Sequence, residues 1–468
     1  MQEPWDLETD VVVVGAGACG LMTTVIIASA NTGLEVVLLE KNSRWGCNAE
    51  IAGGTIQGAG TRFQKQAGID DSPEIMAADI LRKNRGRSDP AVTRALCEKS
   101  AELVHWMVDD LGVPLALAEE IRRVGHTRPR MHAHPTRSGA PIVGALRERA
   151  TSYSAVAYAD ETPGRALITD DDGSVIGVLA GPEGDTQRIR CKKVVLATDG
   201  FGASRDMLSR FIPGAEDMLY VGVAGNTGDG IRWGMEIGAA TEHMHGYQGH
   251  GFVVPGSGTR LNPGIVMSGG IVVNKHARRF EREDQGYSEW AAVVLAQPDG
   301  VGITIWDERI HAEFLHSHAM AQSLEAGVIR RAHDIEALAR QFRLDAETLG
   351  ATIADYNRGI AERRDSLGRT ILGLPLQPPF YGAFTTGALA HTLGGLKIDA
   401  SGRVLRPDGS PVPNLYAGGG AAAGISGDTP DGYLSASGLL TAYGLGMIIG
   451  QHIVSTLAPS TASNAFTS

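Results

Sequence analysis

"DVVVVGAGACGLMTTVIIASA", residues 10 to 30, decides the fold class of this chain. Its run of valines predicts a buried strand, and the apolar segment that follows predicts a helix. Between them, Gly15, Gly17 and Gly20 form a G-x-G-x-x-G turn, in which backbone N–H groups can meet a pyrophosphate at a helix amino end. The stretch therefore predicts a dinucleotide-binding βαβ unit.

The second strand of that unit supports the same prediction. "LEVVLLEKN", residues 34 to 42, contains Glu40, which lies 20 residues past Gly20. A carboxylate at this point can accept hydrogen bonds from both hydroxyls of an adenosine ribose. Strand, turn, helix, strand and acid in this order distinguish the motif from an ordinary glycine-rich turn.

Composition narrows the class of protein further. With 468 residues, of which 43% are hydrophobic, the chain is long enough for one large domain with an insertion. Its net charge of -11 provides no basic surface for nucleic acid or for an anionic membrane. We therefore expect neither partner.

The expected compartment is the cytoplasm. The four cysteines show neither metal-type nor disulfide-framework spacing, and the first ten residues lack the basic and apolar regions of a signal peptide. The apolar stretch 434–450 is interrupted by polar residues and falls short of the roughly 20 apolar residues that a membrane span needs. We expect no membrane span.

A second glycine-rich loop, "RWGCNAEIAGGTIQGAGTRFQ", occupies residues 44 to 64. At this loop the sequence resembles the fumarate reductase and succinate dehydrogenase flavoprotein family, whose G-G-N-type loop lies along the flavin diphosphate and ring. Asn48, Gly53 and Gly54 fall on that pattern, and Cys47 replaces its second glycine. Cys47 could anchor a flavin covalently, but a small buried filler is the simpler reading.

Further motifs of the same family follow in order along nearly the whole chain. They are matched by "KKVVLATDGFG" (192–202), "GNTGDGIRWGMEIGA" (225–239), "GGIVVNKHARRFERE" (269–283), "HTLGGLKIDASGRVL" (391–405) and "PVPNLYAGGGAAAGISG" (411–427). The resemblance implies FAD as the cofactor. It also implies an α/β fold: a Rossmann-like, glutathione-reductase-like FAD-binding domain at residues 1–245 and 370–468, with an inserted α+β capping domain at 246–369.

Besides Cys47, two positions near the expected flavin depart from the family pattern. Asp199 stands where a glycine is usual, and Gly420 stands where many members have a glutamate that contacts the ribityl chain. The last helix of the family points its amino end at the pyrimidine edge of the flavin, and Gly438 and Leu439 fall there. The residues predicted to bind FAD are Gly15, Ala16, Gly17, Ala18, Cys19, Gly20, Glu40, Lys41, Asn42, Cys47, Asn48, Ala52, Gly53, Gly54, Thr198, Asp199, Gly200, Gly228, Asp229, Gly420, Gly438 and Leu439.

The resemblance also indicates the substrate residues. Fumarate reductases carry one arginine that clamps a substrate carboxylate and another that donates a proton, and the aligned residues here are Tyr433 and Tyr287. Two tyrosines, with Ser435 close to the first, resemble the 3-ketosteroid dehydrogenase branch, especially the Δ4-(5α) enzymes, and related cyclic ketone dehydrogenases. His250 and His391 match family histidines that bind the polar end of the substrate, although both could simply brace the fold.

These residues suit the desaturation of a ketone. Tyr433 can polarise the carbonyl, and Tyr287 can remove the α proton, with Ser435 acting through Tyr433 as the second choice of base. A phenol with an ordinary pKa of ~10 needs a lowered pKa or a relay to act as a base at neutral pH. Each tyrosine could instead be a packed ring with one satisfied hydroxyl.

The predicted activity is therefore FAD-dependent dehydrogenation of a cyclic ketone, with a quinone, a dye or oxygen as electron acceptor, since no second dinucleotide motif occurs. An enone or enoate reductase with Tyr287 as proton donor is the first alternative, and a non-catalytic flavin redox sensor is the second. Two histidine clusters, at residues 126–134 and 243–250, lack the helical spacing with an acid that zinc hydrolysis uses, so no metal is expected.

Overall fold

The computed structural model describes residues 4–121, 123–315 and 317–458. Its internal contacts divide the chain into two compact units. The first unit runs to Glu216, continues over Gly222–Tyr247 and resumes at His391, and the second consists of Asp217–Val221 and Gln248–Ala390. The second unit is thus formed by two segments, one short and one long, that interrupt the first unit.

A largely parallel sheet forms the centre of the first unit, in the strand order β18-β19-β9-β1-β2-β6. β1 pairs in parallel with both β2 and β9, and β19 pairs in parallel with β9, so the ends of these strands lie at one edge. The hairpin β7–β8 extends the sheet beside β9. The bounds are β1 Leu7–Val14, β2 Val36–Leu39, β6 Val156–Ala159, β7 Gly164–Thr169, β8 Val175–Ala180, β9 Gln187–Leu196, β18 Arg403–Leu405 and β19 Pro411–Ala417.

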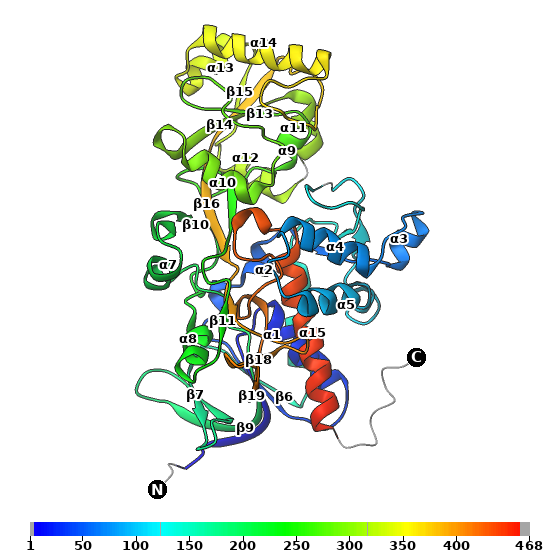
Figure 1. Cartoon of the computed structure of the whole chain (residues 1–468), viewed down its shortest axis with the longest axis vertical. Helices are drawn as coiled ribbons and strands as arrows, with labels where there is room; N and C mark the ends of the chain where they lie inside the picture. The colour runs from blue at the N-terminus through cyan, green and yellow to red at the C-terminus, as the bar shows by residue number, and fades with distance from the viewer. Residues whose placement is uncertain (1–3, 122, 316, 459–468) are drawn as a thin grey trace. The chain divides into compact units, whose positions relative to one another are not determined.

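Helices α1 (Ala18–Ser29) and α15 (Ser437–Leu457) pack along each other in this unit (Figure 1). Glycines of α15 permit the close approach: a Cβ at Gly446 would lie 2.7 Å from the carbonyl oxygen of Cys19, and one at Gly450 would lie 2.8 Å from Cβ of Ile26. The spacing of glycines late in the sequence is therefore a packing surface for α1.

Helix α15 is, among the described residues, the one helix long and apolar enough by composition to cross a bilayer, and 72% of its apolar window is buried inside the protein. Burial of that kind is typical of a core helix. The remaining elements of the unit are α2 Asn48–Ile51, β3 Thr55–Gln57, α3 Arg62–Gln66, α4 Pro73–Lys83, α5 Pro90–Asp109, β4 Ala116–Leu117, β5 Met131–Ala133, α6 Ala140–Ser152, α7 Arg205–Phe211, α8 Asp229–Glu236, β11 Thr241–Glu242 and β17 Gly395–Leu396.

The segments that flank the insertion are joined to each other within the first unit. β11, which precedes the insertion, pairs antiparallel with β17, which follows it. The N–H of Leu393 donates to the carbonyl of Gly246 (2.9 Å), and that of Lys397 donates to Ala240 (2.8 Å). The chain therefore leaves and re-enters the first unit at one hydrogen-bonded base.

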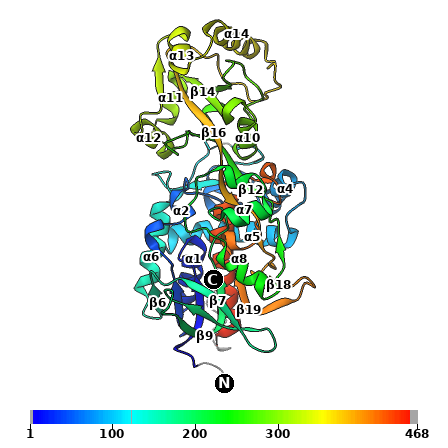
Figure 2. The same ribbon diagram turned by 90° about the vertical axis from the view of Figure 1, so that its left-hand side faces the viewer.

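The second unit is built on a mostly antiparallel sheet in the order β10-β16-β14-β13, with β12 and β15 also paired to β16. Its strands β14 and β16 are labelled in Figure 2. The sequence prediction placed residues 370–390 in the FAD-binding domain, but β16 pairs with β14 from Thr386 to Phe380, which ties these residues to the second unit. The bounds are β10 Leu219–Tyr220, β12 Tyr247–Val253, β13 Ile271–Val273, β14 Val301–Asp307, β15 Arg330–Ala332 and β16 Phe380–Thr392.

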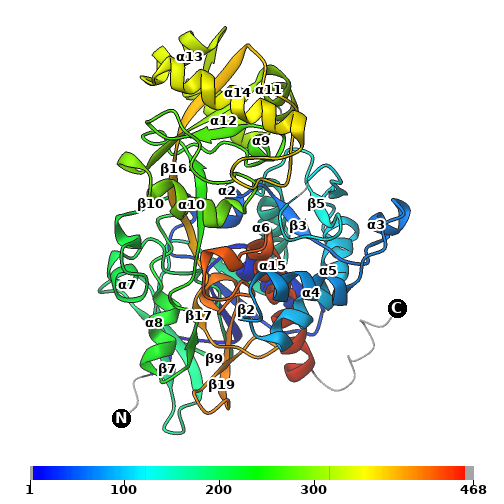
Figure 3. The same cartoon turned by 45° about the horizontal axis from the view of Figure 1, so that its top comes forward.

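Helices complete the second unit, and α13 and α14 lie side by side in it (Figure 3). Buried apolar residues of this unit form a core of their own, distinct from the core around β1. The helices are α9 Gly264–Met267, α10 Tyr287–Leu295, α11 Glu308–Phe314, α12 His318–Glu325, α13 Ile335–Phe342 and α14 Ala346–Glu362.

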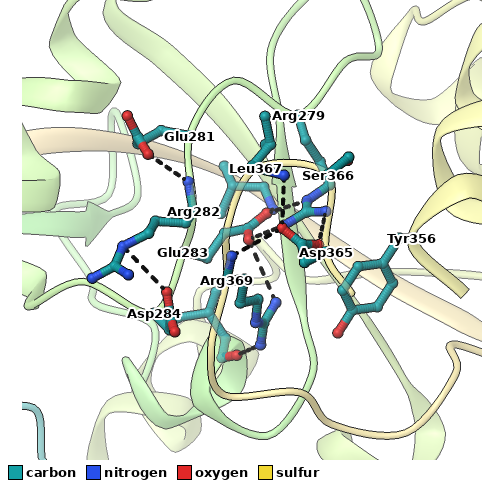
Figure 4. A network of polar contacts seen from close by, with 12 residues as sticks. Arg279, Glu281, Arg282, Glu283, Asp284, Tyr356, Asp365, Ser366, Leu367 and Arg369 are labelled. Atoms are coloured by element: carbon teal, nitrogen blue, oxygen red, sulfur yellow. Dashed lines mark hydrogen bonds and ion pairs between the residues drawn. The ribbon is translucent and has the colours of Figure 1, made fainter. Parts of the chain in front are cut away.

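A buried ionic network fixes the segment that leads into α10 (Figure 4). Arg279 binds both carboxylate oxygens of Glu283 (2.7 and 2.6 Å) and both oxygens of Asp365 (2.6 and 3.4 Å). Arg369 lies 3.5 Å from Glu283 and donates to the carbonyl of Gly270 (2.9 Å). Arg279 and Glu283, the first and last residues of the "RFERE" motif, are therefore structural residues of the second unit.

Candidate functional site

The dinucleotide turn has the backbone that its glycines predict. Gly15 adopts a φ of +103°, and a side chain there would collide with the carbonyl oxygen of Ala197 at the end of β9. A side chain at Gly20 would collide with the carbonyl oxygen of Gly15. Gly17 is less crowded, because the nearest atom to its Cβ position is Cβ of Cys47 at 3.5 Å. The glycines therefore let β1, α1 and β9 meet closely, and they leave the turn itself open.

Glu40 is held between this turn and the end of β2. Its Oε2 accepts from the N–H of Ala16 (2.9 Å), and its Oε1 accepts from the N–H of Asn42 (2.9 Å). Each carboxylate oxygen keeps further acceptor capacity. The geometry suits a group that stabilises the turn and can also accept ribose hydroxyls.

Three further predicted cofactor residues meet beside this point. Nζ of Lys41 lies 2.7 Å from Oδ2 of Asp229 and donates to Oγ1 of Thr227 (2.8 Å). Asp229 is the first residue of α8, and Gly228 before it has a φ of +78°. The ion pair thus connects the end of β2 to the start of α8, a link that the sequence motifs did not indicate.

The second glycine loop crosses the same region. Oδ1 of Asn48 accepts from the N–H of Val223 (3.1 Å), and Gly54 (φ +60°) lies against the carbonyl of Ser138. Among the described residues, no atom beyond the two chain neighbours lies within 4 Å of a Cβ at Gly53, and Ala52 precedes it. Burial raises the pKa of the Cys47 thiol to about 12, with Glu50 adding to the effect. Cys47 is therefore a neutral filler here rather than a reactive thiolate.

Two buried polar atoms support a bound cofactor in this unit. Oγ1 of Thr198 and Oε1 of Gln57 have no hydrogen-bond partner within the described ranges, although Nε2 of Gln57 donates to the carbonyl of Ser435 (2.8 Å). Buried polar atoms are nearly always paired, so such atoms indicate a missing partner. Together with the open glycine positions, these residues fit FAD.

Asp199 and Gly420 face each other across neighbouring strand ends. Asp199 has a φ of +61°, and its Oδ1 accepts from the N–H of Gly200 (2.7 Å). A Cβ at Gly420 would collide with that same Oδ1 and would lie 2.7 Å from the Gly200 nitrogen. Burial raises the pKa of the Asp199 carboxyl, and the nearby His391 and Lys41 partly oppose the shift. Asp199 thus occupies the space that a side chain at residue 420 would otherwise fill.

His391 and Tyr433 meet at the amino end of α15. Their ring centroids are 5.7 Å apart at an interplanar angle of 74°. Nδ1 of His391 donates to the carbonyl of Thr392 (3.0 Å), which leaves Nε2 as the acceptor of the neutral ring. A Cβ at Gly438 would lie 3.2 Å from this Nε2 and 3.5 Å from the Tyr433 hydroxyl, and the half-buried Leu439 follows. The structure therefore brings three predicted residues together.

Ser435 is placed by residues that the sequence prediction missed. Its carbonyl accepts from Gln57 and from Nε2 of His126 (3.1 Å). Burial and the charge of Arg130 lower the pKa of His126 to about 4, so the ring is neutral at pH 7. His126 belonged to a histidine cluster weighed as a metal site, and its partner lies 309 residues away, so no local pattern could reveal this role.

The second unit contains the other predicted pair, His250 and Tyr287. Their ring centroids are 5.3 Å apart, and Nδ1 of His250 accepts from the N–H of Phe252 (3.3 Å). Tyr287 is the first residue of α10. Arg260, which the sequence prediction also missed, interacts electrostatically with Tyr287, while burial lowers the pKa of its guanidinium. A phenol, an imidazole and a guanidinium are thus grouped in this unit.

Comparison with known proteins defines the class. The family described as FAD binding domain matches residues 10–432. This chain belongs to that family of FAD-binding flavoproteins, and it is an oxidoreductase that acts on CH–CH bonds with FAD as cofactor. The predicted family, cofactor and fold class are confirmed.

Three particular proteins show how the chain relates to its neighbours. A probable fumarate reductase from Shewanella frigidimarina is 28% identical over 426 residues, which cover 90% of this chain and 71% of that protein. The open conformation of a flavocytochrome c3 fumarate reductase has a TM-score of 0.81 and 26% identity, covering 96% of this chain and 79% of that one. The 3-ketosteroid-Δ4-(5α)-dehydrogenase from Rhodococcus jostii RHA1, in complex with 4-androstene-3,17-dione, has a TM-score of 0.76 and 26% identity, covering 96% and 97%.

Proposed function

We propose that this protein desaturates the carbon–carbon bond next to a ketone in a cyclic, largely apolar substrate of the 3-ketosteroid type. The observation that supports this proposal most directly is a pair of neutral polar groups at the amino end of α15. They are the Tyr433 hydroxyl and Nε2 of His391, and both lie beside Gly438. The likeness to a 3-ketosteroid-Δ4-(5α)-dehydrogenase over nearly the whole of both chains supports it.

Tyr433 is the group that binds the substrate carbonyl. Removal of an α proton places enolate charge on the carbonyl oxygen, and a hydroxyl aimed at that oxygen stabilises the charge as it develops. The Tyr433 side chain is only 7% exposed, so its hydrogen bonds are weakly screened. The first N–H groups of α15 add positive potential on the same side.

Tyr287 removes the α proton. His250 is the polar side chain packed against its ring, and the nearby positive charge of Arg260 favours the phenolate. Bound FAD would supply the acceptor for the β hydrogen, which leaves as hydride. Ser435, acting through Tyr433, is the second choice of base.

The electrons leave to a quinone, a dye or oxygen. The FAD-binding unit uses its dinucleotide turn for FAD, and the sequence holds no second G-x-G-x-x-G turn in a strand–helix context for a nicotinamide cofactor. A reoxidation panel with these acceptors identifies the physiological class.

A second candidate function reverses the direction. The 28% identity to a probable fumarate reductase favours reduction of an enone or an unsaturated acid, with Tyr287 as the proton donor. Reduced flavin would then come from a separate electron donor. The residues are the same, and the redox poise of flavin against substrate decides the direction.

An anaerobic mixing experiment distinguishes the ketone dehydrogenase from the enone or enoate reductase. The purified holoenzyme is mixed with a 5α-3-ketosteroid, with cyclohexanone and with buffer, and the flavin absorbance is followed. Bleaching by a ketone supports the dehydrogenase. No bleaching, together with rapid reoxidation of dithionite-reduced enzyme by an unsaturated acid, supports the reductase and rejects the first proposal.

A further inference from the structure

Arg260 is a fixed residue of the second unit with an unusual environment. Its backbone forms a bridge with Val253 at the end of β12, the strand that also carries His250. Its carbonyl accepts from Oγ of Ser323 in α12 (3.1 Å). Both contacts hold the backbone, so the guanidinium emerges from a defined point.

The guanidinium lacks a counter-charge. Nη2 donates to the carbonyl of Val221 (2.6 Å), a neutral acceptor, and no carboxylate lies within 4 Å of the group in the part of the chain that the structure describes. The buried Arg279 and Arg369 of the same unit do have a counter-charge, because each forms an ion pair with Glu283. Arg260 is half-buried rather than fully buried, and partial removal of a charge from water already favours an anionic partner.

The neighbours of Arg260 do not supply the missing anion. Its electrostatic neighbour is Tyr287, whose ring packs on His250, and neither side chain is a carboxylate. Glu289, in the first turn of α10, accepts from the N–H of Gly286 (2.9 Å) and caps the helix. Among the described residues, Arg260 therefore places a guanidinium without an ion-pair partner beside the candidate catalytic tyrosine.

We propose that Arg260 binds a carboxylate of the substrate. With one N–H occupied by Val221, the guanidinium keeps a complete two-donor edge, which matches the two oxygens of a carboxylate. One uncompensated charge suits a monoanion better than a phosphate, which would require further cations. The inference rests on the proposed function and narrows it: the substrate is a cyclic ketone that also bears a carboxylate.

The experiment compares an acid with its ester. The holoenzyme is assayed with oxocyclohexanecarboxylate, with a 3-oxo-5α-steroid acid, and with the methyl ester of each, and turnover with a dye as electron acceptor gives KM and kcat. Wild-type enzyme prefers each acid by about tenfold or more in KM, the range of a charge-assisted hydrogen bond. Arg260→Gln brings the acid-to-ester ratio close to one, and Arg260→Lys lies between.

Controls keep the outcomes separate. Arg364→Gln removes an exposed arginine of the same unit and retains the acid preference. The melting temperature of each variant, with and without the acid, reports folding and binding independently of turnover. Equal KM values for acid and ester in the wild type, or equal losses for both in Arg260→Gln, overturn the inference.

Failure of the ketone proposal gives a different pattern. If no ketone bleaches the flavin, the same acid and ester pairs are tested as unsaturated compounds that reoxidise the reduced enzyme. An acid preference that depends on Arg260 in that assay retains the carboxylate site and rejects only the direction of the reaction.

Discussion

The rings of His391 and Tyr433 meet nearly perpendicular, with centroids 5.7 Å apart, beside the first turn of α15. Tyr433→Phe keeps the ring and removes only the hydroxyl. We expect kcat for ketone oxidation to fall by about 10² to 10³, the usual effect of losing one donor to a developing oxyanion, with FAD content unchanged. Stopped-flow bleaching measures the rate, and an unaltered rate would refute the role of Tyr433.

Gly420 must lack a side chain because Asp199 fills its space. Gly420→Ala is expected to weaken FAD binding and lower the melting temperature, since the new Cβ collides with Oδ1 of Asp199. In Asp199→Gly, which tolerates the same positive φ, the added methyl should cost less. FAD titration of the two single variants and the double variant tests this coupling, and strictly additive losses would contradict it.

His126 makes the fold sensitive to acid. Its pKa is about 4 in the folded protein, below its ordinary 6.5, so protonation favours the unfolded state. Its contribution to stability is present above pH 6.5 and is lost as the pH falls towards 4, by at most about 3 kcal/mol. His126→Gln keeps an N–H donor for Ser435 and does not titrate.

The melting temperature of His126→Gln should therefore fall less between pH 7 and pH 4.5 than that of the wild type. The charged groups close to His126 are unchanged in the variant; they are Arg130, Asp79 and Arg123. Parallel curves for the two proteins over this range would show that His126 is not the responsible group.

The network around Glu283 should dominate the stability of the second unit. Glu283→Gln removes the charge that neutralises Arg279 and Arg369, and we expect a loss of about 3 kcal/mol or more in unfolding free energy. Glu281→Gln, in the same segment but half-buried, is the matched control. Calorimetry of both variants provides the comparison, and equal effects would mean that the network contributes little.

Local patterns allowed the cofactor unit to be predicted from sequence. Gly15, Gly20 and Glu40 act within one βαβ segment, where spacing along the chain translates directly into spacing in the fold. The boundary of the insertion was harder to predict from sequence. The assignment of residues 370–390 depends on pairing between β16 and β14, which are distant in sequence.

The same limit applies to the site. Asp199 and Gly420 were noticed as separate departures from a pattern, and their mutual fit appears only when β9 and β19 lie side by side. Arg260 and His126 belong to no motif. Arg260 stands out because its guanidinium donates a hydrogen bond to a neutral carbonyl, and His126 because it contacts the carbonyl of Ser435. Both properties depend on neighbours in three dimensions.

The pairing of β11 with β17 joins the two chain segments on either side of the long insertion. Both ends of the inserted unit are tied together inside the FAD-binding unit, so the insertion behaves as a cassette on a closed base. We expect that exchange of residues 248–390, together with residues 217–221, whose strand β10 pairs with β16, leaves the cofactor strands in register. A different inserted unit could therefore change the substrate while the FAD-binding unit stays the same.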